Sequence, residues 1–134
     1  MALDEENRQI IVKLEVEKSF NNLAQAKLGI GHGYWDLVAN RLYYALFHAI
    51  TGLLIHDGIS VKSHKGAILA FHNNYVKTGK FRTEEGRIVS YLQSKREEAD
   101  YNCVMTIEKE SIEPYVSLCE SMIHKMRDLC KFDN

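Results

Sequence analysis

The sequence predicts an all-α fold, an up-down bundle of four long helices plus one shorter helix. Apolar residues recur along most of the chain at intervals of about 3.6 residues, the period of an amphipathic α-helix. Strand-like alternation of apolar and polar residues is not sustained. The 134 residues include one proline, Pro114, and 8 glycines that fall mostly where helices must end. This pattern favours a single domain, residues 1–134, with antiparallel neighbouring helices because the connections are short.

The first two helices are predicted from apolar periodicity and glycine. The first runs from Asp4 to about Lys27 and ends in "GIGHG" (Gly29–Gly33). Its apolar face is formed by Val12, Val16, Phe20, Leu23 and Ile30. The second, from about Tyr34 to His56, is apolar on most sides, which indicates the central element of the bundle. Gly58 follows it and can take the left-handed conformation that ends a helix.

The remaining helices are predicted from their starting residues. Ser63 is typical of an N-cap and opens a third helix that extends to Gly79. Thr83, followed by two glutamates, opens a fourth that continues to about Tyr101. Ser111, with Pro114 three residues later, indicates the start of a last helix that runs to about Cys130.

Composition limits the class of protein. The net charge is −1, so no overall positive field recruits nucleic acid, and any such binding needs a local patch. Three cysteines without a CxxC pair are typical of reduced thiols: Cys103, Cys119 and Cys130. The N-terminus lacks a signal-peptide pattern, and the longest apolar stretch is too short and interrupted to span a bilayer. We expect a soluble, cytoplasmic protein without membrane association.

Common cofactor and metal motifs are missing from the sequence. It contains no P-loop, dinucleotide-binding glycine motif, HExxH or G-x-S-x-G elbow. Its six histidines lack the spacing of a compact metal site. The sequence therefore predicts neither a cofactor nor a metal centre.

One face of the second helix carries polar groups inside an apolar run. In "ANRLYYALFHAI", Arg41, Tyr44 and His48 lie at i, i+3 and i+7. Burial of a guanidinium requires a partner or a ligand. Arg41 and His48 are therefore interpreted either as hydrogen-bonded core groups or as the lining of a site. Asp100 on the fourth helix is the expected structural partner of Arg41, although Asp100 also lies four residues after Arg96 on its own helix.

Another group of polar residues lies at the start of the third helix. Ser63, His64 and Lys65 place a hydroxyl, an imidazole and an ammonium beside free backbone N–H groups. A helix N-terminus of this kind can bind phosphate. A ligand at this position is a further hypothesis.

Taken in order, three segments resemble the HEPN family over nearly the whole chain: "NRLYYALFHAITGLLIHDG", "KSHKGAILAFHNNYVKTG" and "SKREEADY". The similarity is to its small stand-alone prokaryotic members, the UPF0332-like branch. It implies a bundle of four or five helices, a homodimer, and a minimal nucleotidyltransferase as the partner in a toxin–antitoxin pair. Many active HEPN proteins are metal-independent RNases, which use an Arg and a His separated by four to six intervening residues on a late helix.

This chain departs from that motif. Arg96 is present, but Tyr101 stands where the histidine is expected, so catalysis would need His48 or His64 from elsewhere. In related pairs the partner transfers a nucleotide to a tyrosine near the motif, and the resemblance makes Tyr101 the candidate.

The sequence thus favours an RNA- or nucleotide-binding HEPN module. Its expected cleft is lined by Arg41, Tyr44, His64, Lys65, Arg96 and Tyr101. Two alternatives remain open: a metal-independent endoribonuclease toxin, and a non-catalytic dimeric scaffold.

Overall fold

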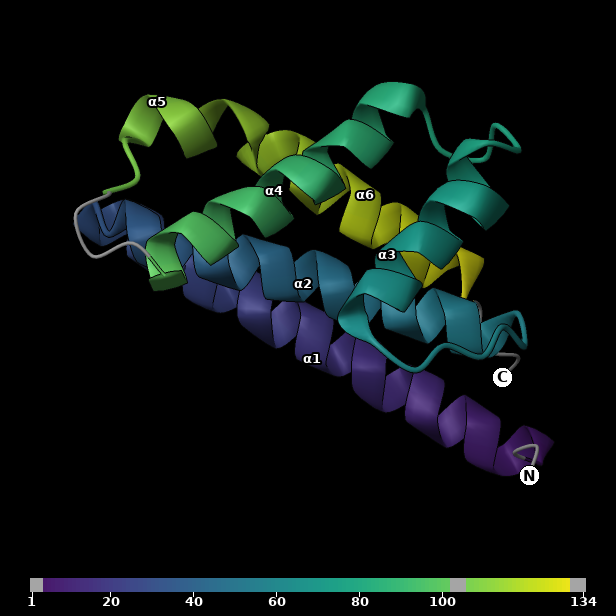
Figure 1. The fold of residues 1–134 in the computed structure, drawn as a ribbon. Helices are drawn as coiled ribbons and strands as arrows, with labels where there is room; N and C mark the ends of the chain where they lie inside the picture. Colours follow the sequence, from purple (N-terminus) through teal and green to yellow (C-terminus); the bar gives the residue numbers. More distant parts are fainter. Residues whose placement is uncertain (1–3, 102–105, 131–134) are drawn as a thin grey trace.

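The computed structural model describes residues 4–101 and 106–130, and these residues form helices joined by short turns (Figure 1). The fold is all-α, as expected. The elements are α1 (Glu5–His32), α2 (Trp35–His56), α3 (His64–Phe71), a π-helical turn (His72–Val76), α4 (Thr83–Tyr101), α5 (Lys109–Ile112), a 3-10 turn (Glu113–Tyr115) and α6 (Val116–Leu129). Four of them, α1, α2, α4 and α6, are the long helices of the bundle.

Helices α1 and α2 form an antiparallel hairpin (Figure 1). Polar contacts join them along their length, and residue numbers rise on α1 as they fall on α2. These contacts are Glu15–His48, Ser19–Ala45 and Asn22–Arg41. The hairpin therefore places polar residues of α1 beside the polar face of α2 that carries Arg41, Tyr44 and His48.

The ends of α1 and α3 follow from local capping. The Asn7 N–H donates to Asp4 Oδ1 at 2.8 Å, and the Gly66 N–H donates to Ser63 Oγ at 2.9 Å. Helix α1 runs past the expected Lys27 because only Gly33, with φ 72°, adopts the left-handed conformation that ends it. Gly29 stays helical; a Cβ there would lie 2.9 Å from Val38 Cγ2, so its small size lets α2 approach.

The chain after Ser63 differs from the single helix expected up to Gly79. Helix α3 ends at Phe71 and continues as the π-helical turn to Val76. The His72 ring lies between the carbonyl groups of Ile68 and Gly86, at 2.9 Å from Nδ1 and 3.0 Å from Nε2. This side chain joins the end of α3 to the start of α4. Helical periodicity in the sequence does not predict such a long-range contact.

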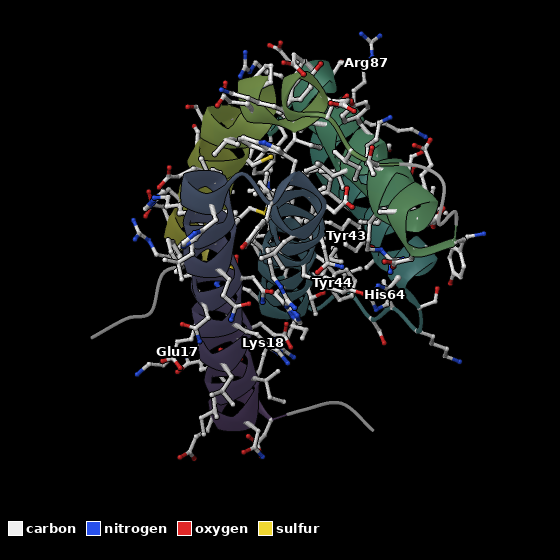
Figure 2. All side chains as sticks on the ribbon, turned by 90° about the vertical axis from the view of Figure 1, so that its left-hand side faces the viewer. Glu17, Lys18, Tyr43, Tyr44, His64 and Arg87 are labelled. Atoms are coloured by element: carbon white, nitrogen blue, oxygen red, sulfur yellow. The ribbon has the colours of Figure 1, made fainter. Side chains whose placement is uncertain are left out.

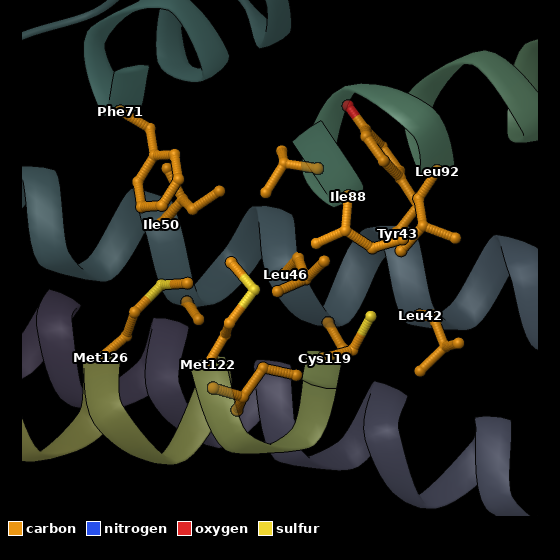
Figure 3. Packing of buried hydrophobic residues seen from close by; sticks show 14 of the residues in the cluster. Leu42, Tyr43, Leu46, Ile50, Phe71, Ile88, Leu92, Cys119, Met122 and Met126 are labelled. Carbon is orange, nitrogen blue, oxygen red and sulfur yellow. The ribbon is translucent and has the colours of Figure 1, made fainter. Parts of the chain in front are cut away.

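Helix α2 lies at the centre of the hydrophobic core (Figure 3). Its side chains Leu46 and Ile50 are fully buried and pack with Met122 of α6 and Leu92 of α4. By length and composition α2 could cross a membrane, but 61% of its apolar window is buried inside the bundle, as in the core helix of a soluble protein.

Two of the three cysteines lie in the described residues, both buried and free. Burial raises the pKa of the Cys119 and Cys130 thiols to about 12 in each case. Both are therefore protonated near neutral pH. Cys103 lies outside the described residues.

Candidate functional site

The candidate site lies where α2 faces the start of α3 and the C-terminal half of α4. Figure 2 shows Tyr43 and Tyr44 of α2 beside His64, the first residue of α3. The two tyrosine rings meet edge to face, with centroids 5.1 Å apart. Burial raises the pKa of the Tyr43 hydroxyl, and this effect outweighs the positive charge of Arg96, which acts to lower the pKa. Tyr43 is therefore a neutral phenol that can donate or accept a hydrogen bond.

Arg96 of α4 contacts both tyrosines. Its Cζ lies 5.1 Å from the centroid of Tyr43 and 5.6 Å from that of Tyr44, within the range of a cation–π contact. One terminal nitrogen, Nη1, donates to Tyr44 Oη at 3.2 Å and to Asp100 Oδ2 at 3.1 Å. The Nε atom is buried and has no hydrogen-bond partner among the residues that the structure describes. The guanidinium, with five N–H donors, therefore uses only part of its donor capacity on the described residues.

His64 packs face to face on Phe47, with ring centroids 3.9 Å apart and an angle of 11° between the planes. Its Nδ1 lies 3.4 Å from Tyr43 Oη. Burial lowers the pKa of His64, and the charges of Arg96 and His48 lower it further. The imidazole is therefore mainly neutral near pH 7 and able to accept a proton.

His48 lies one turn along α2 from Tyr44 and is held by α1. Its Nδ1 is 2.8 Å from Glu15 Oε2, and both side chains are largely shielded from solvent. The His48 ring lies 6.4 Å from Tyr44 and 5.4 Å from Phe47, centroid to centroid. The two imidazoles therefore share the same aromatic neighbours, although they come from different helices.

Arg41 does not pair with Asp100, so that prediction was wrong. Arg41 Nη1 donates to Asn22 Oδ1 at 3.2 Å, and Asp100 accepts from Arg96 on its own helix. The i, i+4 spacing on α4 provides Asp100 with a nearer cation. Within the part of the chain that the structure describes, Arg41 Nε is buried without a hydrogen-bond partner and no carboxylate forms an ion pair with this arginine.

The other two expected site residues lie apart from the cluster. Lys65 is on the rim of an open groove of about 360 Å³ between α3 and α4, together with residues such as Gln93 and Glu97. Tyr101 ends α4 and is 84% exposed. The structure therefore groups Tyr44, His64 and Arg96, places His48 next to them, and leaves Lys65 and Tyr101 at the periphery.

Three residues of the site were missed from the sequence. Tyr43 and Phe47 lie at i and i+4 beside the predicted polar face, and their aromatic spacing could have indicated them. Glu15 gave no local signal, because its partner His48 is 33 residues away.

Comparison with known proteins gives the family. The HEPN domain model matches residues 12–129. This chain belongs to the HEPN family. The match includes every residue of the Arg96–Tyr43–Tyr44–His64 cluster, and it confirms the resemblance drawn from the three ordered segments.

Curated relatives extend over most of this HEPN chain. A "UPF0332 protein" of Thermotoga maritima is 31% identical over 107 residues, 80% of this chain and 81% of the relative. "Putative toxin MJ0605" of Methanocaldococcus jannaschii is 31% identical over 117 residues, 87% of this chain and 86% of the relative. "Putative toxin MJ0142" of the same organism is 26% identical over 98 residues, 73% of this chain and 67% of the relative.

Proposed function

We propose that this HEPN protein is the toxin-type member of a two-protein system and binds RNA or a nucleotide at Arg96. The carrying observation is the Arg96 guanidinium, which lies against two tyrosine rings and donates a hydrogen bond to Tyr44 Oη. Two relatives named as putative toxins support the toxin-type role, and the chain matches 67% and 86% of their lengths. A guanidinium beside aromatic rings provides charge-assisted hydrogen bonds to phosphate and a stacking surface for a base.

Each group of the site has a role in this proposal. Arg96 binds a phosphate next to Tyr44, whose ring stacks on the neighbouring base. His64 contacts the same phosphate through its exposed edge. Arg41 and Lys65 provide positive charge for flanking phosphates, since the one partner of Arg41 among the described residues is the neutral amide of Asn22.

Fluorescence anisotropy with a short labelled single-stranded RNA tests this binding. We expect Arg96→Gln to weaken binding at least tenfold. Arg87→Gln is the matched control, because it removes the same charge from an exposed position of α4 that lies well away from Tyr43, Tyr44 and His64 (Figure 2). Equal binding by the two variants, or no binding by the wild type, contradicts the proposal and favours the non-catalytic dimeric scaffold.

The proposed partner is a minimal nucleotidyltransferase that acts as antitoxin, with this chain as a homodimer. Tyr101 is the proposed modification site, and its 84% exposure supports access of a second enzyme to the hydroxyl. Intact mass spectrometry of the protein from its native cells should reveal a nucleotide adduct that Tyr101→Phe abolishes. Sedimentation at micromolar concentration tests the dimer, and a purely monomeric protein would contradict it.

A second candidate function is a metal-independent endoribonuclease. The observation in its favour is that His64 hydrogen-bonds Tyr43, whose ring also contacts Arg96. An imidazole with a lowered pKa next to a guanidinium is a suitable base for phosphodiester chemistry. Cleavage of the labelled RNA in EDTA, lost in Arg96→Gln, distinguishes this enzyme from a binding module.

A further inference from the structure

Glu15 and His48 form a histidine–carboxylate pair that the binding proposal does not use. The 2.8 Å contact joins α1 to α2, and the side chains are 25% and 15% exposed. The other two such pairs in the described residues are more open and local. They are His56–Asp57, between adjacent residues, and His124–Glu120, within one helix.

The ring contacts of His48 place the Glu15–His48 pair next to the candidate site. Tyr44 lies 6.4 Å from His48 and 6.3 Å from His64, centroid to centroid. Phe47 contacts both imidazoles. Tyr44 also accepts the hydrogen bond of Arg96, so the ring next to this guanidinium has one imidazole from α2 and one from α3 as neighbours.

The second nitrogen of His48 is available for chemistry. Glu15 occupies Nδ1, while Nε2 makes no hydrogen bond to any residue that the structure describes and is not among the buried unpartnered atoms. A carboxylate on one side of an imidazole fixes its tautomer and stabilises the ring when it is protonated. His48 is thus oriented by α1, with Nε2 accessible to a ligand.

We propose that Glu15 and His48 form a dyad that transfers a proton during metal-independent RNA cleavage, with His64 as the second proton-transfer group. This inference rests on the proposed binding of RNA at Arg96. It assigns the histidine function to α2 and α3, whereas the family motif would place it near Tyr101 on α4. His48 and His64 are then catalytic residues, and Glu15 is a positioning residue.

The reaction is a transesterification at phosphorus. His64 takes the proton of the ribose 2′-OH, and the 2′-oxygen forms a bond to the adjacent phosphorus. The bond from phosphorus to the 5′-oxygen of the next nucleotide breaks, and His48 Nε2 gives its proton to that oxygen. The products are a 2′,3′-cyclic phosphate and a 5′-hydroxyl, and a proton exchange with water resets both imidazoles. Arg96 stabilises the charge that develops on the phosphoryl oxygens.

The test separates binding from cleavage. A short single-stranded RNA is cleaved in EDTA while its fully 2′-O-methylated copy, which lacks the attacking hydroxyl, reports affinity by anisotropy. The variants are His48→Gln and Glu15→Gln. His56→Gln is the matched control, because it removes a histidine from a carboxylate pair at the far end of α2.

We expect His48→Gln to lower kcat by about 100-fold or more, the usual size of a general acid–base contribution, with KM and affinity nearly unchanged. Glu15→Gln should lower kcat less and shift the pH–rate profile, since the Glu15 carboxylate from α1 contacts His48 directly. The other charged groups nearby are His64 from α3, which interacts with His48, and Arg96 from α4, which contacts the neighbouring Tyr44. His56→Gln should cleave like the wild type.

Two results overturn the dyad and leave the binding function intact. One is a wild-type protein that binds the methylated RNA but does not cleave the ribose form. The other is a His48→Gln protein that retains the wild-type kcat. Failure of the wild type to bind the methylated RNA removes the binding proposal itself. Thermal unfolding of each variant shows whether it is folded, and Glu15→Gln preserves the shape of the pair if His48→Gln does not fold.

Discussion

The imidazole of His64 stacks on the ring of Phe47, with centroids 3.9 Å apart and planes 11° from parallel. This contact joins α3 to α2 and holds His64 close to Tyr43 and Arg96. Because the stack shields one face of the imidazole, it contributes to the burial that lowers the pKa of His64. Phe47 has no titratable group of its own, but its ring helps to lower the pKa of His64.

Replacement of Phe47 should change that protonation. In Phe47→Ala we expect the pKa of His64 to rise toward its ordinary value of 6.5, because the ring that shields it is lost. Two-dimensional NMR of the imidazole carbons across a pH titration measures the change. Phe20→Ala, which removes the aromatic partner of His124 between α1 and α6, is the control and should leave the His64 curve unchanged.

The same pKa predicts a pH dependence of stability. Below 6.5 the unfolded chain binds a proton at His64 that the folded chain binds only at lower pH, so the free energy of unfolding falls as pH decreases from this value. Above 6.5 the contribution is constant. Urea unfolding of wild type and His64→Gln on both sides of this pH should show a shallower decline in the variant. Parallel declines would indicate that His64 is not perturbed in the folded state.

The salt dependence of RNA binding should identify the phosphate contacts. Each arginine that binds a phosphate of single-stranded RNA contributes about 0.7 to the slope of log K against log salt concentration. Arg41→Gln and Arg96→Gln should each reduce the slope by about this amount, whereas Arg87→Gln should not. An unchanged slope for Arg41→Gln would show that its contact with Asn22 is structural only.

Two glycines should respond to alanine in opposite directions. A Cβ at Gly86 would lie 3.0 Å from Val76 Cγ2 and 3.1 Å from His72 Cδ2, where the His72 ring is fixed by two carbonyls. We expect Gly86→Ala to destabilise the protein by about 1–3 kcal/mol, the usual cost of overpacking. Gly31→Ala meets nothing within 4 Å and should stabilise α1 by about 0.5 kcal/mol. Chemical denaturation measures both, and equal shifts would contradict the steric argument.

Much of the fold was predictable because its signals are local. The apolar run of α2 specifies the central helix, and the Ser63 hydroxyl specifies where α3 begins. The exception is the segment after Phe71, where the helix changes to a π-helical turn. The His72 side chain of this segment hydrogen-bonds the Gly86 carbonyl of α4, and the residue spacing within the segment does not predict that contact.

The sequence by itself determined an all-α bundle, its family and the polar face of α2 that carries Arg41, Tyr44 and His48. The tertiary structure alone decided the partners of those side chains. Arg41 contacts Asn22 and His48 contacts Glu15 because α1 packs antiparallel to α2 in one register. Hydrophobic burial and capping act within a few residues of chain, whereas hydrogen-bond partners depend on how separate helices pack, which the spacing within any one helix does not specify.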